Sequence, residues 1–219
     1  MRSVFKEHLV DLEEDLFTMG EMVSLAIKRS IKALKERDVE EAERIKNDDK
    51  QITETRWEIE EKCIHLIATQ QPVAKDLREL IAVLNIITDL ERMGDYAEGI
   101  AKIVVYLGDQ PPVKPLIDIP RMADIAVDMI NKSLKAYAER NDHAARQLCD
   151  VDDEVDELYN QVNRELIMIM IEDPRTITRA TYLIWASHNL ERIADRVTNI
   201  CERIIFLVTG EMMENVSKY

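Results

Sequence analysis

Apolar residues recur along this chain at alternating steps of four and three, the spacing of the buried face of a helix in a bundle. The first row of this kind belongs to a segment that ends near residue 36 and contains no proline. Its members are Phe5, Leu9, Leu12, Leu16, Met19, Val23 and Ala26. The row predicts a first long helix over residues 5–36.

Residues that typically start helices divide the rest of the first half. Asp38 precedes an acidic first turn, which favours a helix N-terminus, and we predict a second helix from there to residue 69. Pro72 follows a short break and is typical of the first helical position, so a third helix is expected from Pro72 to residue 107.

Prolines gather in one place in the middle of the chain. Four of the six lie between residues 108 and 120, at Pro111, Pro112, Pro115 and Pro120. Because proline cannot continue a helix and stiffens an extended chain, we predict a connector over residues 108–120. It would separate a first bundle, residues 1–107, from a second, residues 121–219.

The pattern then starts again. We expect a fourth helix over residues 121–140 and a fifth over residues 142–171. Asp173 is a suitable N-cap before Pro174, which opens a sixth helix that ends near Gly210.

The second half repeats the first, and this observation determines the predicted fold class. Identities at a constant spacing of 103 residues include Met19 and Met122, Ile27 and Ile130, Ser30 and Ser133, Lys32 and Lys135, Glu36 and Glu139, Arg37 and Arg140, Ala42 and Ala145, and Asp49 and Asp152. Near the end, the four residues at 90–92 and 95 recur 100 positions later. The sequence therefore predicts an all-α protein of two tandem three-helix bundles, six long helices related by an internal repeat.

The repeated motif that carries chemistry is E-x-x-x-D. Glu91 and Asp95 lie in the third predicted helix, and Glu191 and Asp195 lie in the sixth. Residues four apart share one face of a helix, so each pair directs two carboxylates to one place. Both pairs continue a row of apolar residues. Burying a charged carboxylate in such a row costs free energy unless a cation neutralises it.

A hairpin count adds a third carboxylate to each pair. Asp95 lies 23 residues after Pro72, so folding back at that proline brings it level with Asp49, 23 residues before it. Folding back between residues 173 and 174 likewise brings Asp195 level with Asp152 and Glu191 near Asp156. Carboxylates without imidazole or thiolate partners suit hard or borderline cations, and bridging carboxylates suit more than one ion.

An alternative interpretation of these carboxylates stays open. Most helical acidic residues are solvated, and these could be neutralised by Arg78, Arg92 or Arg192 as ordinary ion pairs. His188, three residues before Glu191, is either a further ligand or a surface and packing residue.

Composition limits the partners and the cellular compartment that we expect for this protein. The chain of 219 residues has 43 acidic and 29 basic side chains, a formal charge of −14, which disfavours nucleic acid as a partner. Cys63, Cys149 and Cys201 form neither a disulfide framework nor a zinc spacing and are expected to be reduced. The acidic start differs from a leader peptide, and no run of 18 apolar residues occurs, so we expect a soluble, cytoplasmic protein.

These motifs resemble the signature of the PhoU family, the phosphate-specific transport system accessory proteins that regulate phosphate uptake. The resemblance rests on D-L-E-R-M-G-D at 89–95, N-L-E-R-I-A-D at 189–195, Q-P-V-A at 71–74 and D-L-R at 76–78. It covers nearly the whole chain. It implies two tandem three-helix bundles that bind a multinuclear metal cluster, usually of iron and sometimes of nickel or zinc.

The resemblance also implies roles for particular residues. Glu91, Asp95, Glu191 and Asp195 match the metal-binding motifs, whereas Asp49 and Asp152 are added only by the hairpin count. The family often has a histidine after the second aspartate, where this chain has Arg196, and Tyr96 occupies the matching place in the first repeat.

By the same resemblance, the expected function is negative regulation of the phosphate-starvation response and modulation of high-affinity phosphate transport, without catalysis. The expected partners are a membrane sensor histidine kinase with its response regulator, the ATPase of the phosphate ABC transporter, and a second copy in a homodimer. Such a protein would be cytoplasmic and peripheral to the membrane through its partners. Two other classes stay open: a carboxylate-bridged metalloenzyme, either oxidase or hydrolase, and a helical adaptor whose carboxylates are solvated.

Overall fold

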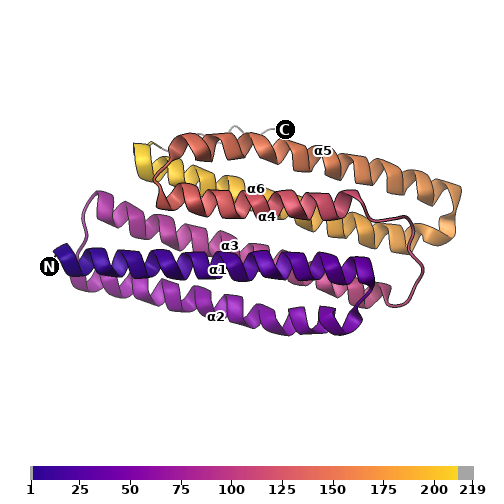
Figure 1. Ribbon diagram of the computed structural model, residues 1–219, viewed down its shortest axis with the longest axis horizontal. Coiled ribbons are helices and arrows are strands. Elements are labelled where there is room, and N and C mark those ends of the chain that lie inside the picture. The colour runs from indigo at the N-terminus through magenta and orange to yellow at the C-terminus, as the bar shows by residue number, and fades with distance from the viewer. Residues whose placement is uncertain (1, 212–219) are drawn as a thin grey trace.

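The computed structural model describes residues 2–211 and is built of long helices (Figure 1). In chain order these are α1 (Arg2–Glu36), α2 (Val39–Gln70), α3 (Lys75–Leu107), α4 (Asp118–Ala138), α5 (Asp142–Glu172), the short 3₁₀ helix η1 (Pro174–Thr176) and α6 (Ile177–Thr209). No strand occurs within the described residues. The predicted all-α fold of six long helices is confirmed.

The helices form two groups of three that lie side by side in an elongated molecule (Figure 1). In each group the three helices all contact one another, α1 with α2 and α3, and α4 with α5 and α6. The groups meet where α3 packs on α6 and α1 packs on α4, while α2 and α5 lie on the two outer sides.

Several helix ends follow the sequence signals. The side chain of Asp38 accepts a hydrogen bond from the backbone N–H of Glu41, so the N-cap predicted for the second helix is confirmed. Asp173 accepts one from the backbone N–H of Arg175, but it caps the 3₁₀ helix η1, and α6 itself begins later, at Ile177. Gly210 ends α6 at a φ of 78°, a left-handed conformation that glycine adopts without strain.

The role predicted for Pro72 is wrong. Residues 71–74 form the turn between α2 and α3, and the helix begins only at Lys75. Gln71 and Ala74, on either side of the proline, both have a φ of 48°, which no continuous right-handed helix allows. Pro72 therefore lies inside the turn rather than at the first position of α3.

The connector is shorter than predicted, because α4 begins at Asp118 and includes Pro120. A proline in the first turn is tolerated, since its missing N–H would have no partner within the helix. The same helix ends at Ala138, before Arg140, which has a left-handed φ of 52°.

The predicted apolar rows form the core. Along α1, Leu12, Leu16, Met19 and Val23 are at most 1% exposed. The buried side chains of all six helices belong to one continuous hydrophobic cluster that extends through both groups. Burial of this apolar surface is the main force that holds the two groups together.

The contact between α3 and α6 keeps one register along its whole length. The two helices run antiparallel, and Asp89 lies opposite Asn199, just as Tyr106 lies opposite Tyr182. Between these pairs, a side chain at Gly99 would collide with Asn189, because the place of its missing Cβ is only 2.8 Å from the Asn189 Nδ2 atom. Close helix approach explains this glycine.

A buried polar bridge joins the groups at one point of this contact. The Asp89 carboxylate, only 8% exposed as a residue, accepts hydrogen bonds from Arg196 at 3.3 Å and Asn199 at 3.4 Å. Burial raises the pKa of the Asp89 carboxyl, and these two partners oppose that shift without cancelling it.

The helices do not have the character of membrane spans. Among residues 2–211, no helix combines the length and the apolar composition that crossing a bilayer requires.

Replacing Asp89 with Ala should lower the free energy of unfolding by about 1–2 kcal/mol, because Arg196 and Asn199 lose their partner in a buried interface. Urea unfolding monitored by circular dichroism measures the change. Asp89→Asn is the matched control, since position 189 of the second repeat is already Asn. Burial disfavours the charged carboxylate, so the amide should change stability by less than about 0.5 kcal/mol. Equal losses in both variants would contradict this account.

Candidate metal centre

The hairpin of α2 and α3 brings the three carboxylates of the first repeat together. We call Asp49, Glu91 and Asp95 the first carboxylate cluster. Asp49 lies against Gly94, with its Oδ1 atom 3.2 Å from the place a Cβ would occupy there. Burial, together with the negative charges of Asp95, Glu98 and Glu91, raises the pKa of Asp49 to about 6.

The hairpin of α5 and α6 does the same in the second repeat. We call Asp152, Glu191 and Asp195 the second carboxylate cluster. Burial and then the charges of Asp156, Asp195 and Glu191 raise the pKa of Asp152 to about 7. Burial and the Asp195 charge raise the pKa of Glu191 to about 7 as well. The hairpin count therefore located both the third carboxylate and Asp156 correctly.

The E-x-x-x-D side chains lie at the edge of the apolar rows rather than within them. Their exposed fractions are 21% for Glu91, 43% for Asp95, 19% for Glu191 and 34% for Asp195. In each pair the glutamate is the more buried residue. Both clusters thus combine partial burial with access to solvent, as a site that receives an ion from solution requires.

Arginine side chains lie close to several of these carboxylates. Arg92 and Arg192 each pair with the aspartate three residues later, Arg92 with Asp95 at 3.2 Å and Arg192 with Asp195. From α2, Arg56 approaches Glu91 at 3.5 Å. Part of the alternative interpretation is therefore correct: ion pairs offset some of the negative charge.

The arginines leave part of the second carboxylate cluster uncompensated. The Oδ1 atom of Asp152 and the Oε2 atom of Glu191 are buried and accept no hydrogen bond. Buried polar atoms without partners are uncommon and costly, which makes these oxygens candidates for a cation. His188 lies 3.3 Å from the same Glu191 oxygen, where a protonated imidazole would form an ion pair, and its ring also contacts Tyr159.

The carboxylates of the two clusters are suitable ligands for a metal ion, but their oxygens are not yet arranged around a common point. Within residues 2–211, no three His, Cys, Asp or Glu side chains are already arranged as a metal site. An ion at the second carboxylate cluster would need its oxygens to move together and Arg192 to leave Asp195. The six ligands stay a prediction.

The two departures from the family pattern have structural roles. Arg196 binds Asp89 across the groups. Tyr96 interacts by its side chain with Arg192 and Arg196, and this interaction raises the pKa of Arg192. Both residues therefore belong to the contact between α3 and α6, next to the clusters.

The cysteines take no part in either cluster. All three are free thiols; Cys63 and Cys201 are buried and Cys149 is half-buried, as expected. Burial raises the pKa of the Cys63 thiol to about 12.

Sequence reasoning missed Arg56 and Glu98. Arg56 was detectable, because the same hairpin count places it level with residue 88, within one turn of Glu91. Glu98 lies with Asp49 in the wall of a cavity of about 90 Å³. It lies one turn beyond the motif, and no pattern in the sequence pointed to it.

Fold and site together define an all-helical tandem-repeat protein with one carboxylate cluster in each repeat. A family model described as the PhoU domain matches twice, over residues 16–104 and 119–204, which is once in each three-helix group. The chain belongs to the PhoU family.

Relatives match along nearly their whole length. A protein of Clostridium acetobutylicum named phosphate-specific transport system accessory protein PhoU homolog is 40% identical, over 97% of this chain and 98% of the relative. A protein of the same name from Aquifex aeolicus is 39% identical, over 97% and 96% of the two chains.

Two solved structures share the fold. The crystal structure of PhoU from Pseudomonas aeruginosa has a TM-score of 0.89 at 33% identity, covering 94% of this chain and all of that one. The phosphate transport system regulatory protein PhoU from Streptococcus pneumoniae has a TM-score of 0.89 at 31% identity, with 96% and 99% of the two chains covered.

Replacing Asp152 with Asn should raise the stability of the metal-free protein at pH 7.5 by roughly 1 kcal/mol, after allowance for solvent screening. The substitution removes one of several like charges. A carboxyl whose folded pKa is raised from 3.8 to about 7 costs stability as pH rises through that window, so stability should increase as pH falls from 7.5 to 5.

Thermal unfolding in the presence of a chelator measures both effects, and the pH dependence should be weaker in Asp152→Asn. The control is Asp150→Asn, an exposed position on α5 that lies outside the second carboxylate cluster. A loss of stability in Asp152→Asn under these conditions would show that the carboxylate is compensated in the folded protein.

Proposed function

We propose that this protein is a negative regulator of the phosphate-starvation response and an accessory protein of high-affinity phosphate transport. It acts by contact with other proteins and needs no catalytic step. The observation that carries the proposal is the match of the PhoU domain to both repeats, with relatives of that name aligned over almost the entire chain.

The partners in this proposal are a membrane sensor histidine kinase, with its response regulator, and the ATPase of the phosphate transporter. A protein of this kind works in the cytoplasm and reaches the membrane through these partners. Long helices with exposed outer faces on α2 and α5 offer surfaces for docking, and for a second copy in a homodimer. Docking would favour the inactive or phosphatase state of the kinase when phosphate is plentiful.

Metal binding is the second part of the proposal. Asp152, Glu191 and Asp195 would hold a metal in the second repeat, and Asp49, Glu91 and Asp95 would hold one in the first. A multinuclear cluster, of iron or else zinc or nickel, would supply positive charge that neutralises the carboxylates. The unpartnered buried oxygens of Asp152 and Glu191 support this assignment most directly.

Metal content tests the site itself. Protein purified without an affinity tag should contain metal, measured by inductively coupled plasma mass spectrometry. Glu191→Ala should lose more than half of it, because this carboxylate is the least exposed of the four in the motifs. Glu157→Ala, an exposed acidic position on α5, serves as the control. Unchanged metal in Glu191→Ala would remove Glu191 as a ligand.

Gene expression tests the regulatory role. A deletion strain grown in phosphate-rich medium should express its phosphate-uptake genes constitutively, and the wild-type gene should restore repression. Normal repression in the deletion strain would contradict the regulator. Complementation by Glu191→Ala separates the two parts of the proposal: full restoration would mean that metal at the second carboxylate cluster is not the signal.

A further inference from the structure

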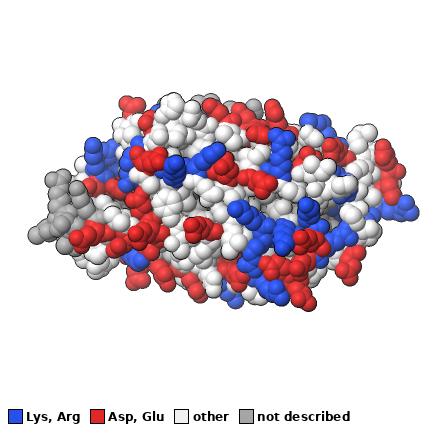
Figure 2. Space-filling model, in the orientation of Figure 1, with Lys and Arg blue, Asp and Glu red and all other residues white. Residues whose placement is uncertain are grey.

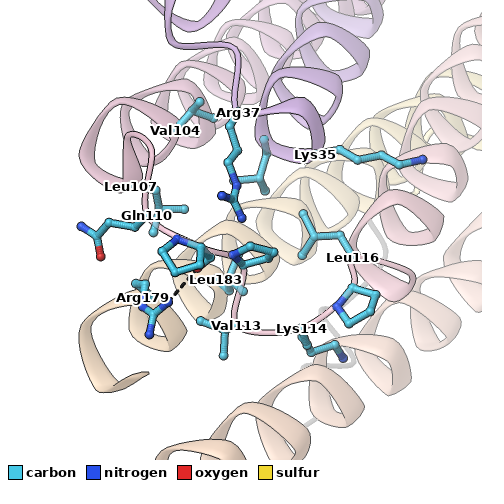
Figure 3. Close-up of a pocket in the computed structure, with 14 residues that line it drawn as sticks. Lys35, Arg37, Val104, Leu107, Gln110, Val113, Lys114, Leu116, Arg179 and Leu183 are labelled. Carbon is cyan, nitrogen blue, oxygen red and sulfur yellow. Dashed lines mark hydrogen bonds between the residues drawn. The ribbon is translucent and has the colours of Figure 1, made fainter. Parts of the chain in front are cut away.

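A pocket of about 290 Å³ lies where the two three-helix groups and the connector meet (Figure 3). Its wall comes from the end of α1, the end of α3, the connector and the first turns of α6. Nine of its lining residues are apolar, among them Leu107, Pro112 and Leu183. We call this space the connector pocket. It shares no residue with either carboxylate cluster.

The charged side chains that line the connector pocket are all positive. Lys35, Arg37, Lys114 and Arg179 line it, and no acidic side chain does. This is the reverse of the whole chain, in which acidic residues outnumber basic ones by 43 to 29. On the surface, basic side chains gather toward the right of the view, near the end of α1 (Figure 2). The charged part of the pocket lining is thus basic, on a protein that is acidic as a whole.

Two of the four basic side chains that line the pocket already have partners within the protein. Lys114 pairs with Asp118 at 3.5 Å and with Glu165, and Arg179 donates a hydrogen bond of 2.7 Å to the carbonyl of Pro111. These two residues therefore hold the connector to α4, α5 and α6.

The side chains of Lys35 and Arg37 form no hydrogen bond or ion pair within the described part of the chain. Arg37 follows α1 directly, at a left-handed φ of 59°. Its guanidinium group extends from the helix end toward the prolines of the connector, into the pocket (Figure 3). Arg37 is half-buried as a residue, and its five guanidinium donors without a protein partner would favour an anion as ligand.

We propose that the connector pocket binds a small organic phosphate. The phosphate would lie at the Arg37 guanidinium, which points into the pocket, and the apolar part would pack against Leu107, Pro112 and Leu183. Arginine favours phosphate because its planar donors match two phosphate oxygens at once. The volume is at the lower end for ligand sites, roughly 300–1,000 Å³, so the occupant is a small molecule. The ligand would contact both repeats, and the proposal is independent of the regulatory function and of metal.

The probe for the test is 1-naphthyl phosphate, which joins a phosphate to an apolar ring system. Isothermal titration calorimetry should show saturable binding of one molecule per chain. Inorganic phosphate and uncharged 1-naphthol should each bind at least about tenfold more weakly, because each lacks one of the two recognised parts. Absence of saturable binding by the wild-type protein would overturn the proposal.

Variants locate the binding to the pocket. Arg37→Gln should weaken binding of 1-naphthyl phosphate about tenfold or more, the cost of losing charge-assisted hydrogen bonds. Val113→Asp, which places a negative charge in the wall, should abolish it. Lys32→Gln is the matched control, one turn earlier on α1, exposed and outside the pocket. Unfolding temperatures confirm that each variant is folded, and wild-type affinity in folded Arg37→Gln would refute the assigned site.

Discussion

The antiparallel packing of α3 on α6 determines how the two carboxylate clusters and the connector pocket are placed relative to one another. Both carboxylate clusters depend on these two helices, and the connector pocket forms where the end of α3 meets the start of α6. The register is held by Gly99 against Asn189 and by the bridge from Asp89 to Arg196. A shift by one helical turn would separate the bridge and move the clusters relative to each other.

The carboxylate clusters work against the stability of the fold that carries them. Like charges at partly buried positions raise the pKa values of Asp49, Asp152 and Glu191, which means that the charged forms are disfavoured in the folded protein. A sequence selected only for stability would place amides or apolar residues there. The local conflict therefore supports a functional origin for the clusters, and nearby arginines reduce its cost without removing it.

Much of the fold could be predicted because its signals are local. Apolar spacing, caps such as Asp38 and the internal repeat identify the helices, and two antiparallel helices of equal rise place Asp49 opposite Asp95 by counting alone. Pro72 was assigned wrongly because a proline fits both a first helical turn and a tight turn. The choice between the two depends on the φ of its neighbours, here the left-handed Gln71 and Ala74.

The features that sequence patterns did not reveal depend on tertiary contacts. The connector pocket assembles from residues that are more than 140 positions apart, such as Arg37 and Leu183, and no repeat or motif joins them. The bridge at Asp89 is equally non-local, because its partners lie more than 100 residues later. Periodicity along one helix indicates which side is buried, but it does not indicate which residue of another helix will face a given position.

The two repeats have diverged at the residues that surround the two proposed cation sites. In the first repeat, Arg56 from α2 approaches Glu91, and Gly94 lets Asp49 come close to α3. In the second repeat, Ala194 replaces that glycine, and the buried oxygens of Asp152 and Glu191 accept no hydrogen bond, although His188 lies 3.3 Å from the Glu191 oxygen. A cation should therefore be held more tightly by the second carboxylate cluster, where it meets uncompensated charge, than by the first, where it must also displace Arg56. The internal symmetry of the fold is thus compatible with two unequal sites, as expected when duplicated helices keep their packing but not their side-chain partners.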